Sequence, residues 1–220
     1  MGEKLIDSVL FKDFTENEID KFIEYSDAKI IEYNIGNYIF NQGENTKYLY
    51  ILLKGAVQVE KIDLDGRRYM VNMFEKSGTI FGEVYLYIDS KEYDYSCVAI
   101  KDSKILEIPK EYASSGELEK NPKLLKNMLS ILSSKAYFLN QKLLIQSSAT
   151  LKQKIAKFLL QELEGKNKVE LRYNRETLAN YIGTTRPSLS RELSNMEEEG
   201  YIIVEKSSIK LMDIEGLKYI

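Results

Sequence analysis

A single helix of about 25 residues is predicted to begin after Pro122, and it divides the chain into two parts. Its apolar residues recur at alternating spacings of four and three positions, so they lie along one narrow stripe of the helix. A stripe of that width is typical of the seam of a coiled coil. The stripe consists of Leu125, Leu129, Leu132, Ala136, Leu139 and Leu143.

A second apolar stripe, with one residue in every seven, lies on a neighbouring face of the same helix. One face can then pack against the chain's own domain while the other meets a second copy, which predicts a symmetric homodimer. The alternative is that both stripes bury the helix in the core of a monomer. The length of the helix and its position between two domains favour the dimer. The second stripe consists of Leu124, Ile131, Phe138 and Ile145.

Residues 28–109 contain short alternating or apolar runs, separated by glycines at intervals of about ten residues. Asp65-Gly66 is a hairpin signal between two of these runs. The pattern predicts a compact antiparallel β-domain, preceded over residues 3–25 by short helices, one of which starts near Thr15. The runs are Tyr38–Phe40, Tyr48–Leu53, Val57–Val59 and Tyr69–Val71.

Residues 174–193 follow the pattern of two helices joined by a tight turn. Asn174 can cap the first helix, and Gly183 supplies the positive φ that the turn needs. Ala179 is small where two crossing helices approach, and Leu189 can fill the core that they share. In front of this segment, Thr150 is expected to cap a further helix that ends at Gly165, and residues 166–173 are expected to form a strand and a loop.

A β-hairpin over residues 201–211 is predicted to follow the two helices and to form a wing. The alternative is an ordinary helical hairpin of an α-rich domain, but the spacing of the small and apolar residues and the following hairpin argue against it. A winged helix-turn-helix is a DNA-binding unit whose second helix enters the major groove. This predicts double-stranded DNA as a partner.

The second helix is expected to begin at Thr185, with Pro187 in its first turn, where a missing N–H breaks no helical hydrogen bond. Arginine can donate two hydrogen bonds to guanine in the major groove, so Arg186 and Arg191 are the predicted base contacts. Hydroxyl groups, helix N–H groups and lysines can hold phosphates. The predicted DNA-binding residues are Arg186, Arg191, Ser188, Ser190, Thr185, Arg175 and Lys206.

The residue types exclude several kinds of chemistry. Cys97 is the only cysteine and the chain has no histidine, which rules out a Cys/His zinc site, a four-cysteine iron–sulfur cluster, an intrachain disulfide and a histidine base. No enzyme and no metal site is predicted. Net charge is −3 overall and +1 over residues 150–220, a weak basic excess for a nucleic-acid binder.

The chain carries no apolar run long enough for a signal peptide or a membrane span, and Ile6 occupies the position where a myristoylation signal needs Ser or Thr. We therefore expect a cytoplasmic protein without a membrane partner.

From about Phe11 to Leu211 the sequence resembles the Crp/Fnr family of transcription regulators. Three segments resemble the family's cyclic-nucleotide-binding β-roll: Asn41–Glu44, Tyr48–Gly55 and Phe81–Val84. The resemblance implies an α+β chain with an N-terminal antiparallel β-roll (jelly-roll-like) with flanking helices, a long dimerisation helix and a C-terminal winged helix-turn-helix. The implied domains are residues 1–120 for the β-roll effector-sensing domain, 121–149 for the dimerisation helix and 150–220 for the DNA-binding domain.

The same resemblance implies an effector pocket in the β-roll, made of Gly82, Glu83, Val84, Tyr95, Ser96 and Asn140. In nucleotide-binding relatives an arginine pairs with the phosphate where this chain has Tyr95, so cyclic AMP is not the expected effector. A cluster of tyrosines around this segment is either an aromatic pocket for another small molecule or a set of half-exposed strand residues without a ligand. The cluster consists of Tyr85, Tyr87, Tyr93 and Tyr95.

These observations predict a homodimeric, sequence-specific DNA-binding regulator that acts on a palindromic operator. We expect control by an unidentified small molecule in the β-roll and no other cofactor, with RNA polymerase as a further partner if the regulator is an activator. One alternative is an effector-independent regulator with a vestigial pocket. Another is a cyclic-nucleotide-binding-like module that regulates a protein partner.

Overall fold

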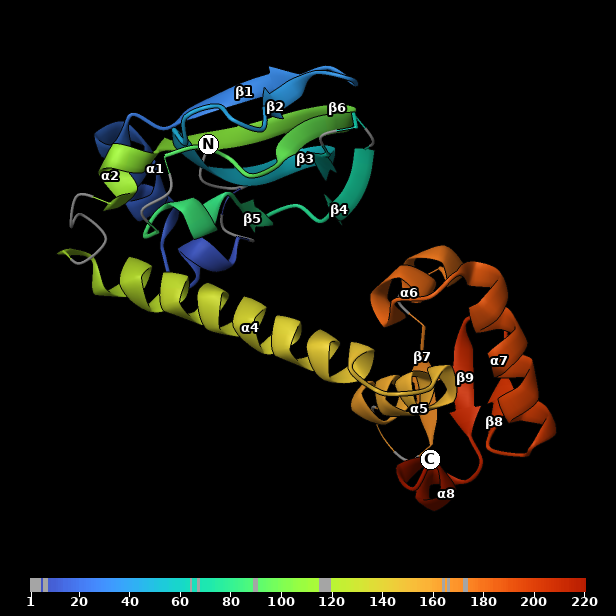
Figure 1. Cartoon of the computed structure of the whole chain (residues 1–220). Coiled ribbons are helices and arrows are strands. Elements are labelled where there is room, and N and C mark those ends of the chain that lie inside the picture. Colours follow the sequence, from blue (N-terminus) through green and yellow to red (C-terminus); the bar gives the residue numbers. More distant parts are fainter. Residues whose placement is uncertain are drawn as a thin grey trace. The chain divides into compact units, whose positions relative to one another are not determined.

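The computed structural model describes residues 5, 8–63, 65–66, 68–88, 91–114, 120–163, 165, 167–171 and 174–220. The chain divides into two compact units, Met1–Leu132 and Ser133–Ile220, each of which is described by itself (Figure 1). The first unit holds the β-sheet and its flanking helices, and the second holds the C-terminal helices with a small sheet. The predicted α+β fold class is confirmed.

Short helices precede the sheet, as the sequence predicts: the 3-10 helix η2 (Val9–Phe11) and α1 (Glu16–Ser26). Thr15 caps α1 in a capping box with Glu18, so each side chain accepts a hydrogen bond from the other residue's backbone N–H. Ile19 and Phe22 point from α1 into the core of the first unit. The predicted helix start at Thr15 is confirmed.

Six antiparallel strands form the sheet: β1 (Lys29–Tyr33), β2 (Tyr38–Phe40), β3 (Tyr48–Ile62), β4 (Arg68–Phe74), β5 (Ile80–Phe81) and β6 (Ser96–Pro109). The order is β1-β6-β3-β4, with β2 paired to β6 and β5 paired to β3. Helices α1 and α2 (Lys110–Ser114) lie at one end of the sheet, and β4 lies at the other (Figure 1). Gly66, with a φ of 77°, lies in the connection between β3 and β4, where the sequence carries its hairpin signal.

The runs at residues 48–53 and 57–59, which the sequence suggests as separate strands, belong to one long strand, β3. The pairing of β3 with β6 shifts register three times between Leu52 and Val57. Gly55 makes this bend possible, with a φ of 97°, and a Cβ atom there would lie 2.3 Å from the hydroxyl oxygen of Ser103. The glycine therefore marks a set of bulges inside a strand and not the end of one.

Aromatic rings fill the interior of the β-roll. Phe40 stacks on Tyr93 with 4.1 Å between ring centroids, and Tyr50 stacks on Phe81 at 5.0 Å. The hydroxyl groups of Tyr50 and Tyr93 lie 3.1 Å apart, and the backbone N–H of Lys47 donates to the Tyr93 hydroxyl. These rings and hydroxyls satisfy one another inside the sheet, which makes this region a packed core.

The long helix is α4 (Pro122–Gln146), whose 25 residues match the expected length. Leu124 and Ile131 of the second stripe are buried in the core of the first unit, and Ile145 is buried in the core of the second. Phe138 of the same stripe is 46% exposed.

The first stripe of α4 differs from the second in its burial. Leu129, Leu139 and Leu143 are 55%, 61% and 65% exposed, Ala136 is also exposed, and Leu125 and Leu132 are partly buried. The alternative in which both stripes bury the helix inside one chain is therefore wrong for these exposed leucines.

The second unit contains α5 (Leu151–Gln161), β7 (Lys168–Glu170), α6 (Arg175–Ile182), α7 (Arg186–Glu198), β8 (Ile202–Val204), β9 (Ser208–Leu211) and α8 (Ile214–Lys218). The three strands form a sheet in the order β7-β9-β8, and β8 with β9 is the expected hairpin. Thr150 caps α5 as predicted.

The predicted end of α5 at Gly165 is wrong. The helix ends at Gln161, and Leu163 lies beyond it, where its side chain packs against the core of the second unit. An apolar residue can pack against the core from the irregular segment after a helix. The apolar character of Leu163 therefore did not show where α5 ends. Lys166, Arg172 and Tyr173, part of the expected strand and loop, lie outside the described residues.

Candidate functional site

The turn between α6 and α7 is fixed by local hydrogen bonds. Asn174 caps α6, accepting a hydrogen bond from the Thr177 backbone N–H at 2.8 Å. Gly183 ends the helix in the left-handed region, with a φ of 79° and a ψ of 48°, and its N–H donates to the Ala179 carbonyl. The Thr184 N–H donates to the same carbonyl at 2.9 Å. The chain can therefore leave α6 and re-enter a helix within three residues.

Helix α7 has one buried face and one exposed face. Thr185 caps it by accepting from the Ser188 N–H, and Pro187 lies in its first turn. Leu189, Leu193 and Met196 follow helical spacing and are at most 3% exposed, so they anchor α7 in the core of the second unit. The opposite face is thereby turned outward.

The predicted DNA-binding residues of α7 gather on that outward side. Thr185, Arg186, Ser190 and Arg191 are exposed. Ser188 is half-buried, and its hydroxyl oxygen lies 2.9 Å from the Thr185 hydroxyl, which donates to it. Both arginines therefore present their guanidinium groups to solvent from one rigid helix.

Lys206 lies at the tip of the β8–β9 hairpin and is exposed. Glu205 and Ser208 close the tip, with the Glu205 N–H donating to the Ser208 carbonyl at 2.9 Å and the Ser208 hydroxyl donating to the Glu205 carboxylate at 2.6 Å. The wing is thus a short, closed turn that presents one lysine.

Arg175 is the first residue of α6. Its side chain is half-buried, and its Nη1 has no hydrogen-bond partner among the described residues. Burial lowers the pKa of this guanidinium. A buried donor without a partner is unfavourable for the fold.

The acidic end of α7 explains the weak basic excess of the unit. Glu197 accepts a hydrogen bond from the Val204 N–H at 2.8 Å, which joins α7 to the wing strand β8. Glu199 pairs with Lys152 of α5, and this hydrogen bond raises the pKa of Lys152. These carboxylates hold the unit together at the end of α7 remote from Arg186.

The residues predicted to hold an effector in the β-roll are engaged by other parts of the chain. Gly82 precedes the 3-10 helix η3 (Glu83–Tyr85), and a Cβ atom there would lie 2.9 Å from the Tyr50 ring. Glu83 is only 4% exposed. The hydroxyl oxygen of buried Ser96 accepts a hydrogen bond from the Gln42 N–H at 2.9 Å.

Of the three further residues of the predicted pocket, two are exposed and one is half-buried. Val84 is 51% exposed, and Asn140 is exposed on the part of α4 that belongs to the second unit. Tyr95, which stands where nucleotide-binding relatives have an arginine, is half-buried, with the Lys61 ammonium 5.3 Å from its ring centroid. Of the five predicted effector residues that lie in the first unit, Glu83 and Ser96 are buried and Val84 is exposed.

The four tyrosines of this region have different environments. Tyr85 and Tyr93 are buried in the aromatic core, and the Tyr85 hydroxyl accepts a hydrogen bond from the Asp94 N–H at 3.1 Å. Tyr87 is 56% exposed, and Tyr95 is half-buried. Two of the four tyrosines are thus part of the packed core. Neither an aromatic ligand pocket nor a set of half-exposed strand residues describes all four. Cys97 is fully buried beside them, and burial raises the pKa of its thiol.

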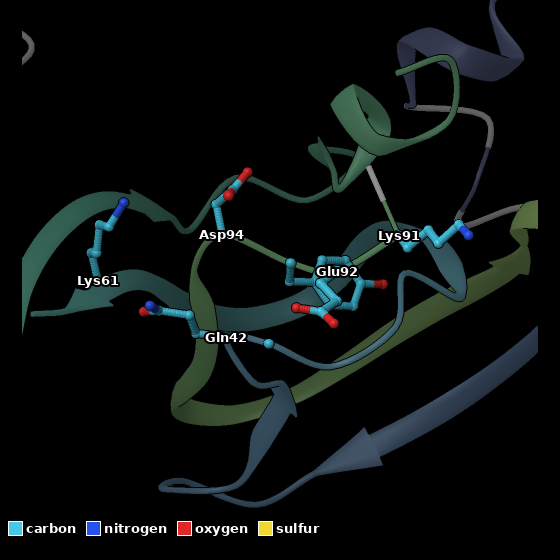
Figure 2. Close-up of a pocket in the computed structure, with 7 residues that line it drawn as sticks. Gln42, Lys61, Lys91, Glu92 and Asp94 are labelled. Atoms are coloured by element: carbon cyan, nitrogen blue, oxygen red, sulfur yellow. The ribbon is translucent and has the colours of Figure 1, made fainter. Parts of the chain in front are cut away.

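An open cavity of about 450 Å³ lies beside this segment, formed by the loop before β3, the end of β3 and the segment before β6. Figure 2 shows its labelled charged and amide side chains spread around the opening. None of the predicted effector residues lines it, although Asp94 is the neighbour of Tyr95. Its lining residues are mostly polar and come from separate segments of the chain, so no sequence motif indicated this cavity. They are Gln42, Gly43, Lys61, Lys91, Glu92, Tyr93 and Asp94.

The described residues offer neither a metal site nor a membrane-spanning helix. They contain no group of three or more Cys, Asp or Glu side chains placed to hold a metal ion. No helix among them is long and apolar enough to cross a membrane.

Comparison with known proteins identifies both parts of the chain. Residues 30–115 match the family model of the cyclic nucleotide-binding domain, and residues 153–220 match that of the Crp-like helix-turn-helix domain. The cyclic AMP receptor protein of Thermus thermophilus is 25% identical over 214 residues, covering 97% of this chain and 96% of the relative. The transcriptional regulator SdrP of the same organism is 28% identical over 178 residues, covering 77% and 81%.

A solved structure extends the match to the fold. The Thermus thermophilus catabolite activator protein superposes with a TM-score of 0.55 at 25% identity, covering 96% of this chain and 97% of that one. The two family models together cover more than half of the chain, one in each part. With an N-terminal domain of the cyclic-nucleotide-binding type and a C-terminal helix-turn-helix, this chain belongs to the Crp/Fnr family of transcription regulators.

Proposed function

We propose that the chain is a homodimeric, sequence-specific DNA-binding regulator in which α7 is the recognition helix. The observation that carries this proposal is the division of α7 into a face buried through Leu189 and Leu193 and an outward face bearing Arg186 and Arg191. Exposed arginines on a firmly packed helix are suited to read guanine edges in the major groove, each good pair being worth about 1–3 kcal/mol of discrimination.

Phosphate contacts would come from around α7. Arg175 at the start of α6 is only partly buried, and the exposed part of its guanidinium could donate a charge-assisted hydrogen bond to a phosphate oxygen. Lys206 at the tip of the wing and the hydroxyl groups of Thr185 and Ser190 are exposed on the same unit. These groups would position the protein on the duplex without reading its sequence.

The exposed leucines of α4 support the homodimer. Leu129, Leu139 and Leu143 repeat along one stripe of the helix and are more than half exposed in the single chain. Pairing of two copies of this stripe would bury them as the seam of a coiled coil. A twofold dimer carries two recognition helices, so the operator would be palindromic, with half-sites about 34–36 Å apart.

For the effector, the packing in the β-roll supports a ligand other than cyclic AMP. Tyr95 replaces the phosphate-pairing arginine, and the Ser96 hydroxyl is already bonded to Gln42. The second candidate is a regulator without an effector, favoured by the aromatic rings that fill the interior of the roll. RNA polymerase would be a further partner if the regulator activates transcription.

Selection of random duplex DNA by the purified chain tests the proposal, followed by titration of the best sequence with and without cyclic AMP. We expect an inverted repeat bound alike in both conditions, with affinity that falls steeply as salt rises. Strong rescue by cyclic AMP would contradict the argument from Tyr95. Absence of any enriched sequence in both conditions would favour the alternative of a module that binds a protein partner.

A further inference from the structure

A second cavity, of about 330 Å³, lies at one end of the β-sheet in the first unit. Strands β1, β6 and β3 run side by side there, with Lys29 opposite Glu107 and Glu107 opposite Tyr50. The cavity lies at the edge where α1 leads into β1 and β6 leads into α2. Its lining includes Asp27, Lys29, Lys47, Tyr48, Glu107 and Glu111.

Glu107 is the distinctive member of this lining because it is a carboxylate on the central strand with only 9% of its surface exposed. The Tyr33 hydroxyl donates a hydrogen bond to its Oε1. Within the described part of the chain, the structure gives no donor to its other oxygen. Burial raises the pKa of this carboxyl.

A carboxylate held in this way is costly for the fold. Burial of a charged group is unfavourable unless it gains hydrogen bonds or an opposite charge, and one phenol supplies only part of this. Lys29, its neighbour across the strands, is paired with Asp27 at 3.3 Å. Glu107 lines the cavity, and its Oε2 has no hydrogen-bond donor among the described residues, so it can accept from a cation there.

Two other side chains complete a site with both signs of charge. Tyr48 is half-buried and is one of the residues that line the cavity, and an aromatic ring is a surface that attracts an organic ammonium. Lys47 is exposed at the same cavity, and its ammonium has no ion pair among the described residues. A buried acid with an aromatic ring beside it and a free lysine nearby is complementary to a molecule that carries an ammonium and a carboxylate.

We propose that this cavity binds a free α-amino acid, with its ammonium group on Glu107 beside Tyr48 and its carboxylate on Lys47. The volume is at the small end of the range for ligand pockets and suits a molecule of this size. The site is distinct from the DNA-binding surface and from the cavity beside Tyr95, since it shares no lining residue with either.

Isothermal titration of the full chain with each of the common L-amino acids tests the proposal, in the absence of DNA. The best of them is then compared with its primary amide, which lacks the carboxylate, and with its N-acetyl form, which lacks the ammonium. We expect binding by at least one amino acid and a loss of about tenfold or more with each derivative, the effect of one charge-assisted hydrogen bond.

The protein side is tested with Glu107→Gln, which removes the charge and keeps an oxygen to accept from Tyr33. This variant is expected to weaken binding of the best amino acid by about tenfold or more. Glu75→Gln, at an exposed glutamate paired with Lys101, is the control and should leave the affinity unchanged. Lys47→Gln gives a second test at an exposed position, where folding is not at risk.

The proposal is overturned if no amino acid binds the folded chain, which would make the Tyr33–Glu107 pair a structural brace only. Equal binding of the N-acetyl form, or binding unchanged in both Glu107→Gln and Lys47→Gln, would also overturn it. Because the titration contains no DNA, its outcome is independent of whether the chain recognises an operator.

Discussion

The side-chain amide of Gln146, the last residue of α4, donates a hydrogen bond to the backbone carbonyl oxygen of Tyr181 at 2.9 Å. Tyr181 lies in the last turn of α6, directly before the turn that leads to α7. The Phe138 ring also packs on the Tyr181 ring, with 5.5 Å between centroids. The C-terminal part of α4 is therefore fixed to the helix-turn-helix. If two copies pair through α4, this contact would help set the direction of each α7.

Replacing Gln146 by Ala should leave the Tyr181 carbonyl without this donor. We expect the free energy of unfolding of the second unit to fall by about 1 kcal/mol, the net worth of one hydrogen bond. Urea unfolding measures this, with Gln141→Ala as the control, since Gln141 on the same helix accepts its hydrogen bond from the exposed side chain of Gln161. An unchanged unfolding midpoint for Gln146→Ala would show that the contact contributes no stability.

Gly183 is expected to be difficult to replace because its φ of 79° lies in the left-handed region. Gly183→Ala should destabilise the second unit by about 1–2 kcal/mol, and Gly183→Asn should cost less because asparagine tolerates this conformation. Any added Cβ atom would lie 3.4 Å from the Gln146 side chain, which can shift slightly. Thermal unfolding of the wild type and both variants measures the order of their stabilities. A Gly183→Ala variant as stable as the wild type would contradict the turn geometry.

The two stripes of α4 should respond differently to substitution. If two copies pair through α4 as proposed, Leu139→Lys with Leu143→Lys should give a folded monomer, because both side chains are exposed in the single chain and would be buried in the proposed seam. Light scattering after gel filtration measures the mass, and Lys126→Glu, at an exposed position outside both stripes, is the control. A double variant that stays dimeric would place the dimer interface elsewhere.

Ile145, by contrast, is fully buried in the core of the second unit. Ile145→Ala should lower the free energy of unfolding by about 2–5 kcal/mol through the lost packing and the resulting cavity. Its dimerisation should be unaffected under conditions where the chain remains folded. A loss of dimer without a loss of stability would contradict this assignment of the two faces.

The stability of the chain should depend on the protonation of Glu107. Because burial raises its folded-state pKa above the ordinary value of 4.5, the folded chain binds this proton more tightly than the unfolded chain. The corresponding stabilisation is complete below the ordinary value and is lost as pH rises through the raised folded-state pKa. The stability of wild type relative to Glu107→Gln should therefore fall from about pH 4 to about pH 7. Urea unfolding at both pH values checks this, and a difference that rises with pH would contradict it.

Much of the fold could be predicted from periodicity and caps. The spacing of apolar residues defined α4, and the capping residues Thr15, Thr150 and Asn174 mark helix starts where the structure has them. These signals are local, since a cap or a stripe needs only neighbours within a few turns. The unity of β3 could not be predicted, because its bulges depend on pairing with β6, a distant segment.

The candidate sites likewise divide into one that local sequence predicts and others that depend on the tertiary fold. Arg186 and Arg191 could be named from the sequence because the helix-turn-helix pattern orients its own exposed face. Residues such as Gln42, Lys61 and Asp94 are brought together only by the tertiary fold, and nothing in their types distinguishes them from other surface residues. Glu107 is likewise an ordinary glutamate until β1 and β3 pair on either side of it.

The central claim is that α7 reads base sequence through its exposed arginines. Its most direct test is selection of random duplex DNA performed in parallel with the wild type and with Arg191→Ala, using Lys218→Ala on α8 as the control. We predict that the wild type and the control enrich the same inverted repeat, with half-sites about 34–36 Å apart, and that Arg191→Ala loses preference at one symmetric position in each half-site. The same selection is run with Arg186→Ala. The claim would be contradicted if both arginine variants enriched the same consensus as the wild type and bound it as tightly.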